Sequence, residues 1–164
     1  MKILIVGTVG TGKTTLAKKL SKDYNIKYYE IDSIVHDDRQ NGRKREEEEQ
    51  NVIVKNINKN EDWIIEGVLR KNLQYLLELA DKIIYLDVPK YKRNIRILKR
   101  YIKQKLKLEK SNYKPDIKML KMMFKWSNDF EKNKKELENL LLKYKNKLKG
   151  ENIWNLKNVV DVLF

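Results

Sequence analysis

The feature that most constrains this chain is residues 2–20, where a short apolar run leads through a glycine-rich turn into a helical pattern. Residues 3–6 are Ile-Leu-Ile-Val, a continuous aliphatic run typical of a strand buried on both faces of a parallel sheet. Leu16, Ala17 and Leu20 then recur at helical spacing. The chain therefore begins with a strand, a loop and a helix, which is the order that parallel α/β folds use.

The loop between strand and helix matches the phosphate-binding pattern G-x-x-x-x-G-K-[ST]. Glycines let the backbone curl its N–H groups around a phosphate, and the following helix adds the positive end of its dipole. We expect Lys13 to reach the β- and γ-phosphates and the Thr14 hydroxyl to bind Mg²⁺. The pattern predicts binding of ATP with Mg²⁺ and leaves the reaction open. The residues expected at the cofactor are Gly7, Val9, Gly10, Thr11, Gly12, Lys13, Thr14 and Thr15, although packing or helix capping is the simpler role for the Thr15 side chain.

At 164 residues the chain has the size of one domain with a sizeable core. It has no cysteine, which rules out disulfides and thiolate metal sites, and a single histidine, His36, which excludes a histidine-rich metal site. No apolar stretch approaches the roughly 18 residues of a membrane span, and the first apolar run is too short for a signal peptide. We therefore expect a cytoplasmic protein without a membrane partner.

The formal net charge of +14 raises a nucleic-acid hypothesis, because a basic surface attracts phosphates without sequence preference. The chain has 30 lysines and 7 arginines, and compositional drift over the whole surface explains this bias more simply. The arginines all lie between residues 39 and 100, where planar guanidinium groups would suit bidentate phosphate contacts. Among them, Arg39, Arg43 and Arg45 are candidate contacts for an acceptor phosphate.

The rest of the chain alternates between strand and helix patterns. Strands are expected at 2–6, 27–31, 62–66, 83–87 and 152–156, and helices at 13–23, 46–59, 73–80, 91–108, 117–149 and 159–164. This alternation predicts one α/β domain over residues 1–164, built on a parallel sheet.

Four of these stretches resemble the nucleoside monophosphate kinase group of P-loop proteins, and most closely the FlaR-type (DNA topology modulation) proteins related to adenylate kinase. They are Gly-Thr-Gly-Lys-Thr-Thr-Leu-Ala (10–17), Trp-Ile-Ile-Glu-Gly (63–67), Leu-Asp-Val-Pro (86–89) and Lys-Pro-Asp (114–116). The resemblance implies a P-loop three-layer sandwich with five parallel strands in the order 2-3-1-4-5. It also implies a helical lid-like insertion at about 101–127, and kinase activity.

Residues 66–70, Glu-Gly-Val-Leu-Arg, resemble the Asp-Gly-Phe-Pro-Arg segment of adenylate kinases. The resemblance implies that Glu66 lies near Mg²⁺ and that Arg70 contacts the acceptor phosphate. Because Glu is one methylene longer than Asp, direct and water-mediated metal contacts both stay open. The simpler alternative is an exposed acid beside a turn glycine.

Arg96 and Arg100 follow Pro89 by seven and eleven residues, the spacing at which the resembled family places arginines on the nucleotide base and phosphates. Four residues apart, they share one helix face and can point at one triphosphate. A solvated basic helix is the alternative. Residues 101–127 contain no arginine, so lysines would have to neutralise charge in the lid-like segment.

Asp32 follows the second expected strand, where small-metabolite kinases of the superfamily carry an acid that binds or deprotonates an acceptor hydroxyl. Helix capping or support of Mg²⁺ are equally open roles. The predicted catalytic residues are Lys13, Asp32, Arg70, Arg96 and Arg100, and the predicted metal ligands are Thr14 and Glu66. We predict an ATP- and Mg²⁺-dependent phosphotransferase, monomeric or homodimeric, acting on a small molecule or a nucleotide. The alternatives are a nucleotide-regulated nucleic-acid-binding protein and a polynucleotide 5′-kinase.

Overall fold

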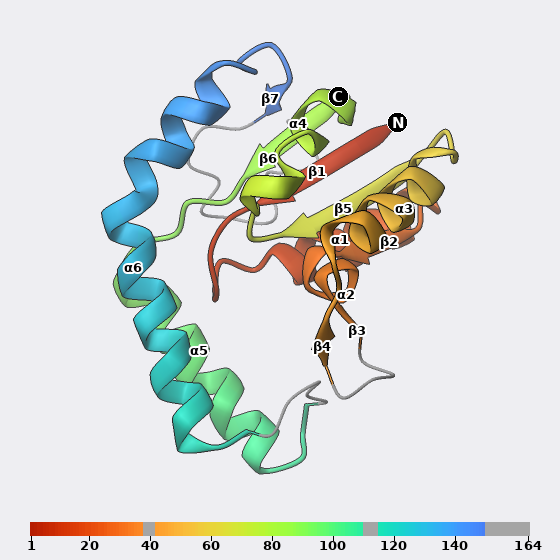
Figure 1. Cartoon of the computed structure of the whole chain (residues 1–164). Helices are drawn as coiled ribbons and strands as arrows, with labels where there is room; N and C mark the ends of the chain where they lie inside the picture. The colour runs from red at the N-terminus through yellow and green to blue at the C-terminus, as the bar shows by residue number, and fades with distance from the viewer. Residues whose placement is uncertain (38–41, 110–114, 150–164) are drawn as a thin grey trace.

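The computed structural model describes residues 1–37, 42–109 and 115–149, and its centre is a five-stranded sheet (Figure 1). The strands lie in the order β2-β5-β1-β6-β7, and every neighbouring pair is parallel. Their bounds are β1 (Lys2–Val6), β2 (Tyr28–Glu30), β5 (Trp63–Gly67), β6 (Lys82–Tyr85) and β7 (Leu148–Lys149).

Counted along the chain, these five strands follow the order 2-3-1-4-5, so the expected α/β class and topology are confirmed. The fifth strand, however, is Leu148–Lys149, within the range that was expected to be helical. The long helix α6 (Ile117–Leu142) ends earlier than expected, because the chain turns after it and Lys147 accepts a hydrogen bond from the Ile83 N–H at 2.8 Å. The strand expected at 152–156 and the helix expected at 159–164 lie outside the described residues.

Two apolar layers cover the sheet, because successive side chains of a strand point to opposite faces. Leu4 and Val6 pack on the side of helix α4 (Leu76–Leu79), whereas Ile3 and Ile5 pack on the side of helix α1 (Lys13–Tyr24). The helices and short turns are α1 (Lys13–Tyr24), α2 (Ile31–Val35), α3 (Glu47–Asn58), η2 (Lys71–Leu73), α4 (Leu76–Leu79), α5 (Lys90–Lys105) and α6. None of those in the described part of the chain combines the length and apolar character needed to cross a membrane.

The polar stretch after β2 folds into a small antiparallel hairpin of β3 (His36–Asp37) and β4 (Arg43–Lys44). The Arg45 guanidinium supports it, donating to the backbone carbonyls of Ser33, Ile34 and His36 at 2.6–3.1 Å. Arg45 therefore serves the fold around α2 rather than an acceptor phosphate. Arg39 lies outside the described residues.

Helices α5 and α6 form an antiparallel pair that projects from the sheet (Figure 1), and Arg93 lies fully buried between them. Its guanidinium donates to the Val88 carbonyl at 2.8 Å, to Ser127 at 3.0 and 3.2 Å, and to the Glu131 carboxylate at 2.6 Å. Lys134 adds an ion pair to Asp87 at 2.5 Å. Arg93 thus joins the helices and is not available to a phosphate. The prediction that the arginines between residues 39 and 100 contact phosphates is therefore wrong for Arg93.

The lysines are spread along the chain, as a compositional drift predicts, but the net positive charge is concentrated in α5 and the segment that follows it, because acidic residues are scarce there. Residues 90–128 contain fourteen lysines and arginines and two acidic residues, so they account for +12 of the net charge of +14. The rest of the chain is nearly neutral. Total composition could not show this, since it discards position along the chain.

We predict that Arg93→Met destabilises the fold by about 3–5 kcal/mol, because it leaves buried acceptors on Val88 and Ser127 unpaired. The matched control is Arg43→Met. Its ion pair with Glu49 has nearly the same length, 2.7 Å, but lies exposed to solvent, so its loss should hardly change the melting temperature. Thermal unfolding of both variants measures the difference. Equal effects would show that Arg93 is not an anchor of the helix pair.

Candidate functional site

The loop between β1 and α1 has the backbone shape of a phosphate-binding turn. Gly12 caps the helix N-terminus with φ of 98°, a left-handed conformation that favours glycine. The Thr11 hydroxyl and the Lys13 ammonium both donate to the Thr8 carbonyl at 2.8 Å, which draws the loop around the Lys13 side chain. Thr15, in contrast, is exposed and caps nothing, so the packing or capping role considered for its side chain is not found.

Lys13 and Glu66 bring opposite charges into the same buried place, with 9% and 3% of their surfaces exposed. Burial lowers the pKa of the Lys13 ammonium, and the charges of Glu66 and Asp32 oppose that shift. Burial raises the pKa of the Glu66 carboxyl, and Lys13 and the Thr14 hydroxyl oppose it. Burial therefore disfavours the charged form of each side chain. Buried groups with shifted pKa values of this kind are typical of functional sites. The alternative of an exposed Glu66 is excluded.

The two predicted metal ligands lie in contact, because the Thr14 hydroxyl donates to the Glu66 carboxylate at 2.5 Å. Both are oxygen donors, which Mg²⁺ prefers, and a Mg²⁺ ion shared with phosphates needs few protein ligands. No group of three or more His, Cys, Asp or Glu side chains that could hold a metal is found within the described ranges. The pair therefore fits a cation that is held jointly by the protein and a nucleotide.

Two further acidic residues, Glu30 and Asp32, lie at the carboxyl end of β2, next to the end of β5 that carries Glu66. The register of these strands places Glu30 opposite Glu66, and the charges of Glu30 and Asp32 act on the pKa values of both Lys13 and Glu66. Asp32 is thus in electrostatic range of the loop. Sequence reasoning missed Glu30, although it ends the strand next to the one that carries Glu66.

Asp32 sits in the first turn of α2 and accepts a hydrogen bond from the Arg70 guanidinium at 3.1 Å. Both side chains are substantially exposed to solvent. The structure therefore brings together an acid and an arginine that are 38 residues apart in the sequence. An exposed pair of this kind can exchange its internal contact for a ligand at little cost.

Arg96 reaches the loop from α5, where its guanidinium donates to the carbonyls of Gly10 and Thr11 at 3.4 and 2.9 Å. Arg100, one turn further, pairs with Glu109 at 3.6 Å, and its charge also contributes to lowering the pKa of Lys13. The predicted spacing thus places both arginines on the side of α5 that faces the loop.

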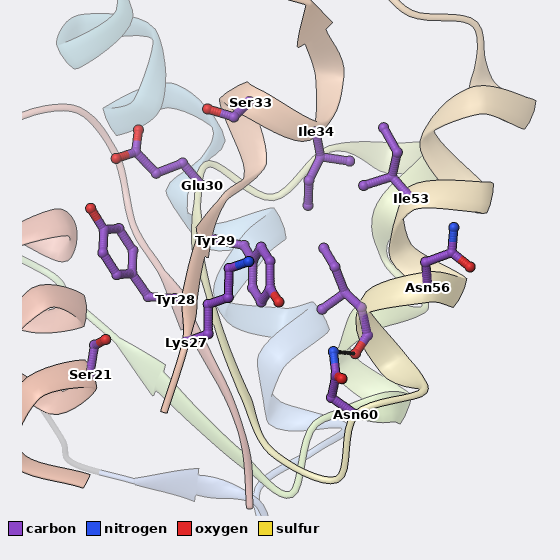
Figure 2. A pocket seen from close by; sticks show the side chains of 11 residues that line it. Ser21, Lys27, Tyr28, Tyr29, Glu30, Ser33, Ile34, Ile53, Asn56 and Asn60 are labelled. Carbon is purple, nitrogen blue, oxygen red and sulfur yellow. Dashed lines mark hydrogen bonds between the residues drawn. The ribbon is translucent and has the colours of Figure 1, made fainter. Parts of the chain in front are cut away.

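The described structure also holds a cavity of about 740 Å³ beside the edge strand β2. Figure 2 shows Tyr29, Ile34 and Ile53 on the side of α3, whereas Tyr28 lies on the other side of the strand with Ser21. None of the predicted catalytic or metal-binding residues lines it. The cavity therefore lies beside the site and not within it, and Glu30, which acts on the pKa values of Lys13 and Glu66, belongs to its lining.

Comparison with known proteins agrees with this geometry. Residues 3–118 match the model of a family described as an AAA domain. The chain belongs to this AAA domain family. No curated protein sequence gives a significant match.

The fold of this AAA domain protein is similar to that of solved kinase structures. It is similar to shikimate kinase from Bacteroides thetaiotaomicron, with 17% identity, coverage of 98% of this chain and 94% of that chain, and a TM-score of 0.57. It is also similar to shikimate kinase from Acinetobacter baumannii in complex with shikimate, with 15% identity, coverage of 98% and 89%, and a TM-score of 0.59. The protein thus has a P-loop kinase-like fold. These matches do not single out the FlaR-type subfamily.

We predict that Gly67→Ala destabilises the protein by about 1–3 kcal/mol, because the added Cβ would lie 2.6 Å from Cβ of Ile31, where α2 starts. Chemical denaturation measures this loss. Gly42→Ala is the control, since its Cβ would meet nothing within 4 Å and it tests only the cost of a positive φ. A Gly67→Ala variant as stable as wild type would mean that β5 and α2 can move apart freely.

Proposed function

We propose that the protein is an ATP- and Mg²⁺-dependent phosphotransferase that acts on a hydroxyl group of a small molecule. The observation that carries the proposal is the burial of Lys13 and Glu66 at the glycine-rich loop, with the partly buried Thr14 hydroxyl bonded to Glu66. A loop that merely connected a strand to a helix would gain nothing from burying two charges against their hydration. Phosphates and a divalent cation would compensate both.

On the donor side, the loop N–H groups and the Lys13 ammonium would bind the phosphates. Thr14 and Glu66 would hold Mg²⁺, which supplies positive charge between the phosphates when it is bound. Arg96 already lies against the loop, so its guanidinium needs little movement to contact a phosphate oxygen. Together these groups would stabilise the charge that develops during transfer.

On the acceptor side, the Asp32 carboxylate would accept the proton of a hydroxyl group. The hydroxyl oxygen forms a bond to the γ-phosphorus, and the bond from that phosphorus to the leaving oxygen of ADP breaks. Arg70 would orient Asp32 through the contact seen at 3.1 Å, or bind an anionic group of the acceptor. The fold likeness to a shikimate kinase bound to shikimate supports a small-molecule acceptor.

Two finer assignments also belong to this proposal. Membership in the FlaR-type subfamily is supported by the four sequence stretches described above. A lid role for residues 101–127 is supported by the place of the described ones among them, 101–109 and 115–127, at the far end of α5 and the start of α6.

We predict that Lys13→Ala lowers ATP turnover at least about a hundredfold without unfolding the chain, because the γ-phosphate loses its buried cation while the loop remains. Single-turnover ATP consumption and circular dichroism measure the two effects. Lys18→Ala is the matched control, since Lys18 is exposed on the same helix. Unchanged turnover in Lys13→Ala would end the phosphotransferase proposal.

We predict that Asp32→Asn reduces kcat by roughly 10²–10⁴-fold and leaves ATP affinity unchanged, because a hydroxyl acceptor needs a proton acceptor. The acceptor is found by screening sugars, other small hydroxyl compounds, nucleoside monophosphates and 5′-hydroxyl oligonucleotides. Asp23→Asn, an exposed acid on α1, is the control. A normal kcat in Asp32→Asn would instead favour a phosphate acceptor, which needs no base.

A further inference from the structure

Helix α5 carries an apolar stripe that is exposed to solvent. The five side chains are between 46% and 63% exposed. They follow one another at intervals of three or four residues, so they line one side of the helix. The stripe consists of Tyr91, Ile95, Leu98, Ile102 and Leu106, the last at the C-cap of the helix.

The opposite side of α5 is the one that packs into the protein. Arg93, Ile97 and Gln104 are its buried residues, and Arg93 and Asn94 bond to Ser127 of α6. A helix with one buried face needs no second apolar face for folding, since polar side chains cost less in water. The stripe therefore requires an explanation other than the core.

The exposed apolar surface is concentrated in this part of the molecule. Ten of the twelve exposed large hydrophobic residues in the described ranges belong to α5, α6 or the turn after α5. They are the five residues of the stripe with Leu108, Ile117, Met122, Trp126 and, at the far end of α6, Leu142. A concentration of this kind, as opposed to scattered single residues, marks an interaction surface.

Lysines border the stripe on both sides. At 100° per residue, Lys92, Lys99 and Lys103 form a row along one border and Lys105 lies at the other, and all four are exposed. Helix α5 contains no acidic residue, and the segment 90–128 carries +12 of the net charge. An occupant of this face must therefore be both apolar and negatively charged.

We infer that the outer face of α5 docks on an anionic lipid membrane, with the apolar stripe at the boundary between headgroups and acyl chains and the lysines on the lipid headgroups. Basic amphipathic helices bind such surfaces in this way. A nucleic acid would satisfy the lysines but leave the stripe in water. A second copy would bring a helix without acidic residues against its own kind. This inference replaces our expectation of no membrane partner, which rested on the absence of a spanning segment.

Docking on this face is compatible with the phosphate loop and does not rest on the proposed function. Arg96 and Arg100, which face the loop, lie on a third side of α5 between the lysine row and the buried face. The loop therefore stays clear of the stripe. A chain without any enzymatic activity would carry the same surface.

The test is co-sedimentation of the full chain with vesicles of phosphatidylcholine alone or mixed with phosphatidylserine. We expect binding to the mixed vesicles alone, weakened by salt. The triple variant Lys92→Gln, Lys99→Gln, Lys103→Gln should lose roughly a hundredfold in affinity, at about fivefold for each lysine. The double variant Leu98→Gln, Ile102→Gln should lose at least roughly tenfold.

Two matched controls separate this face from general charge and apolarity. Lys18→Gln, Lys19→Gln, Lys22→Gln removes three exposed lysines of α1, and Val52→Gln removes an exposed apolar residue of α3. Both should bind mixed vesicles nearly as wild type does. Because all substituted residues are exposed, circular dichroism should show unchanged folding.

Several results would overturn the inference. Equal binding to both vesicle types, or no loss in the two α5 variants, would remove the role of this face. Absence of vesicle binding combined with duplex DNA binding that depends on the lysines, and not on Leu98 and Ile102, would assign the surface to nucleic acid. Absence of vesicle binding combined with a dimer that the Leu98/Ile102 variant dissociates would assign it to a second copy.

Discussion

The parallel pairing of β1 with β5 is the constraint on which the site depends. Its register sets Ile5 against Glu66 and Val6 against Gly67, so the glycine-rich loop and the acid leave the sheet side by side. This adjacency places the Thr14 hydroxyl on the Glu66 carboxylate and buries Lys13 close to both. A shift of one residue in this register would turn the Glu66 side chain to the other face of the sheet.

The buried Lys13 and Glu66 also give the loop a physical reason to bind a ligand, beyond connecting a strand to a helix. Each charge has lost most of its hydration, and the shifts of the two pKa values show that burial outweighs their mutual attraction. Such a cluster stores unfavourable energy in the free protein. A bound phosphate and cation would release it, which couples ligand binding to stability.

Helix α5 meets three different environments on its three sides. Arg93 fixes one side to α6 through a buried network, and Arg96 presents another side to the loop. The third side carries the stripe that begins at Tyr91 and ends at Leu106. Arg93 and Arg96 have unrelated roles although they are only about 60° apart around the helix, because the boundary between the face packed on α6 and the face beside the loop runs between them.

The sequence by itself determined the α/β class, the strand order through the resemblance, and the loop with Lys13 and Thr14, because these depend on local spacing and on periodic burial. Only the tertiary structure decided which charged residues meet. It paired Asp32 with Arg70, set Glu30 opposite Glu66, and buried Arg93, since such contacts join segments far apart in the chain. The last strand of the described sheet, Leu148–Lys149, could not be predicted from the sequence either. Two residues are too few to show an alternation of apolar and polar side chains, and this strand forms only through its pairing with β6.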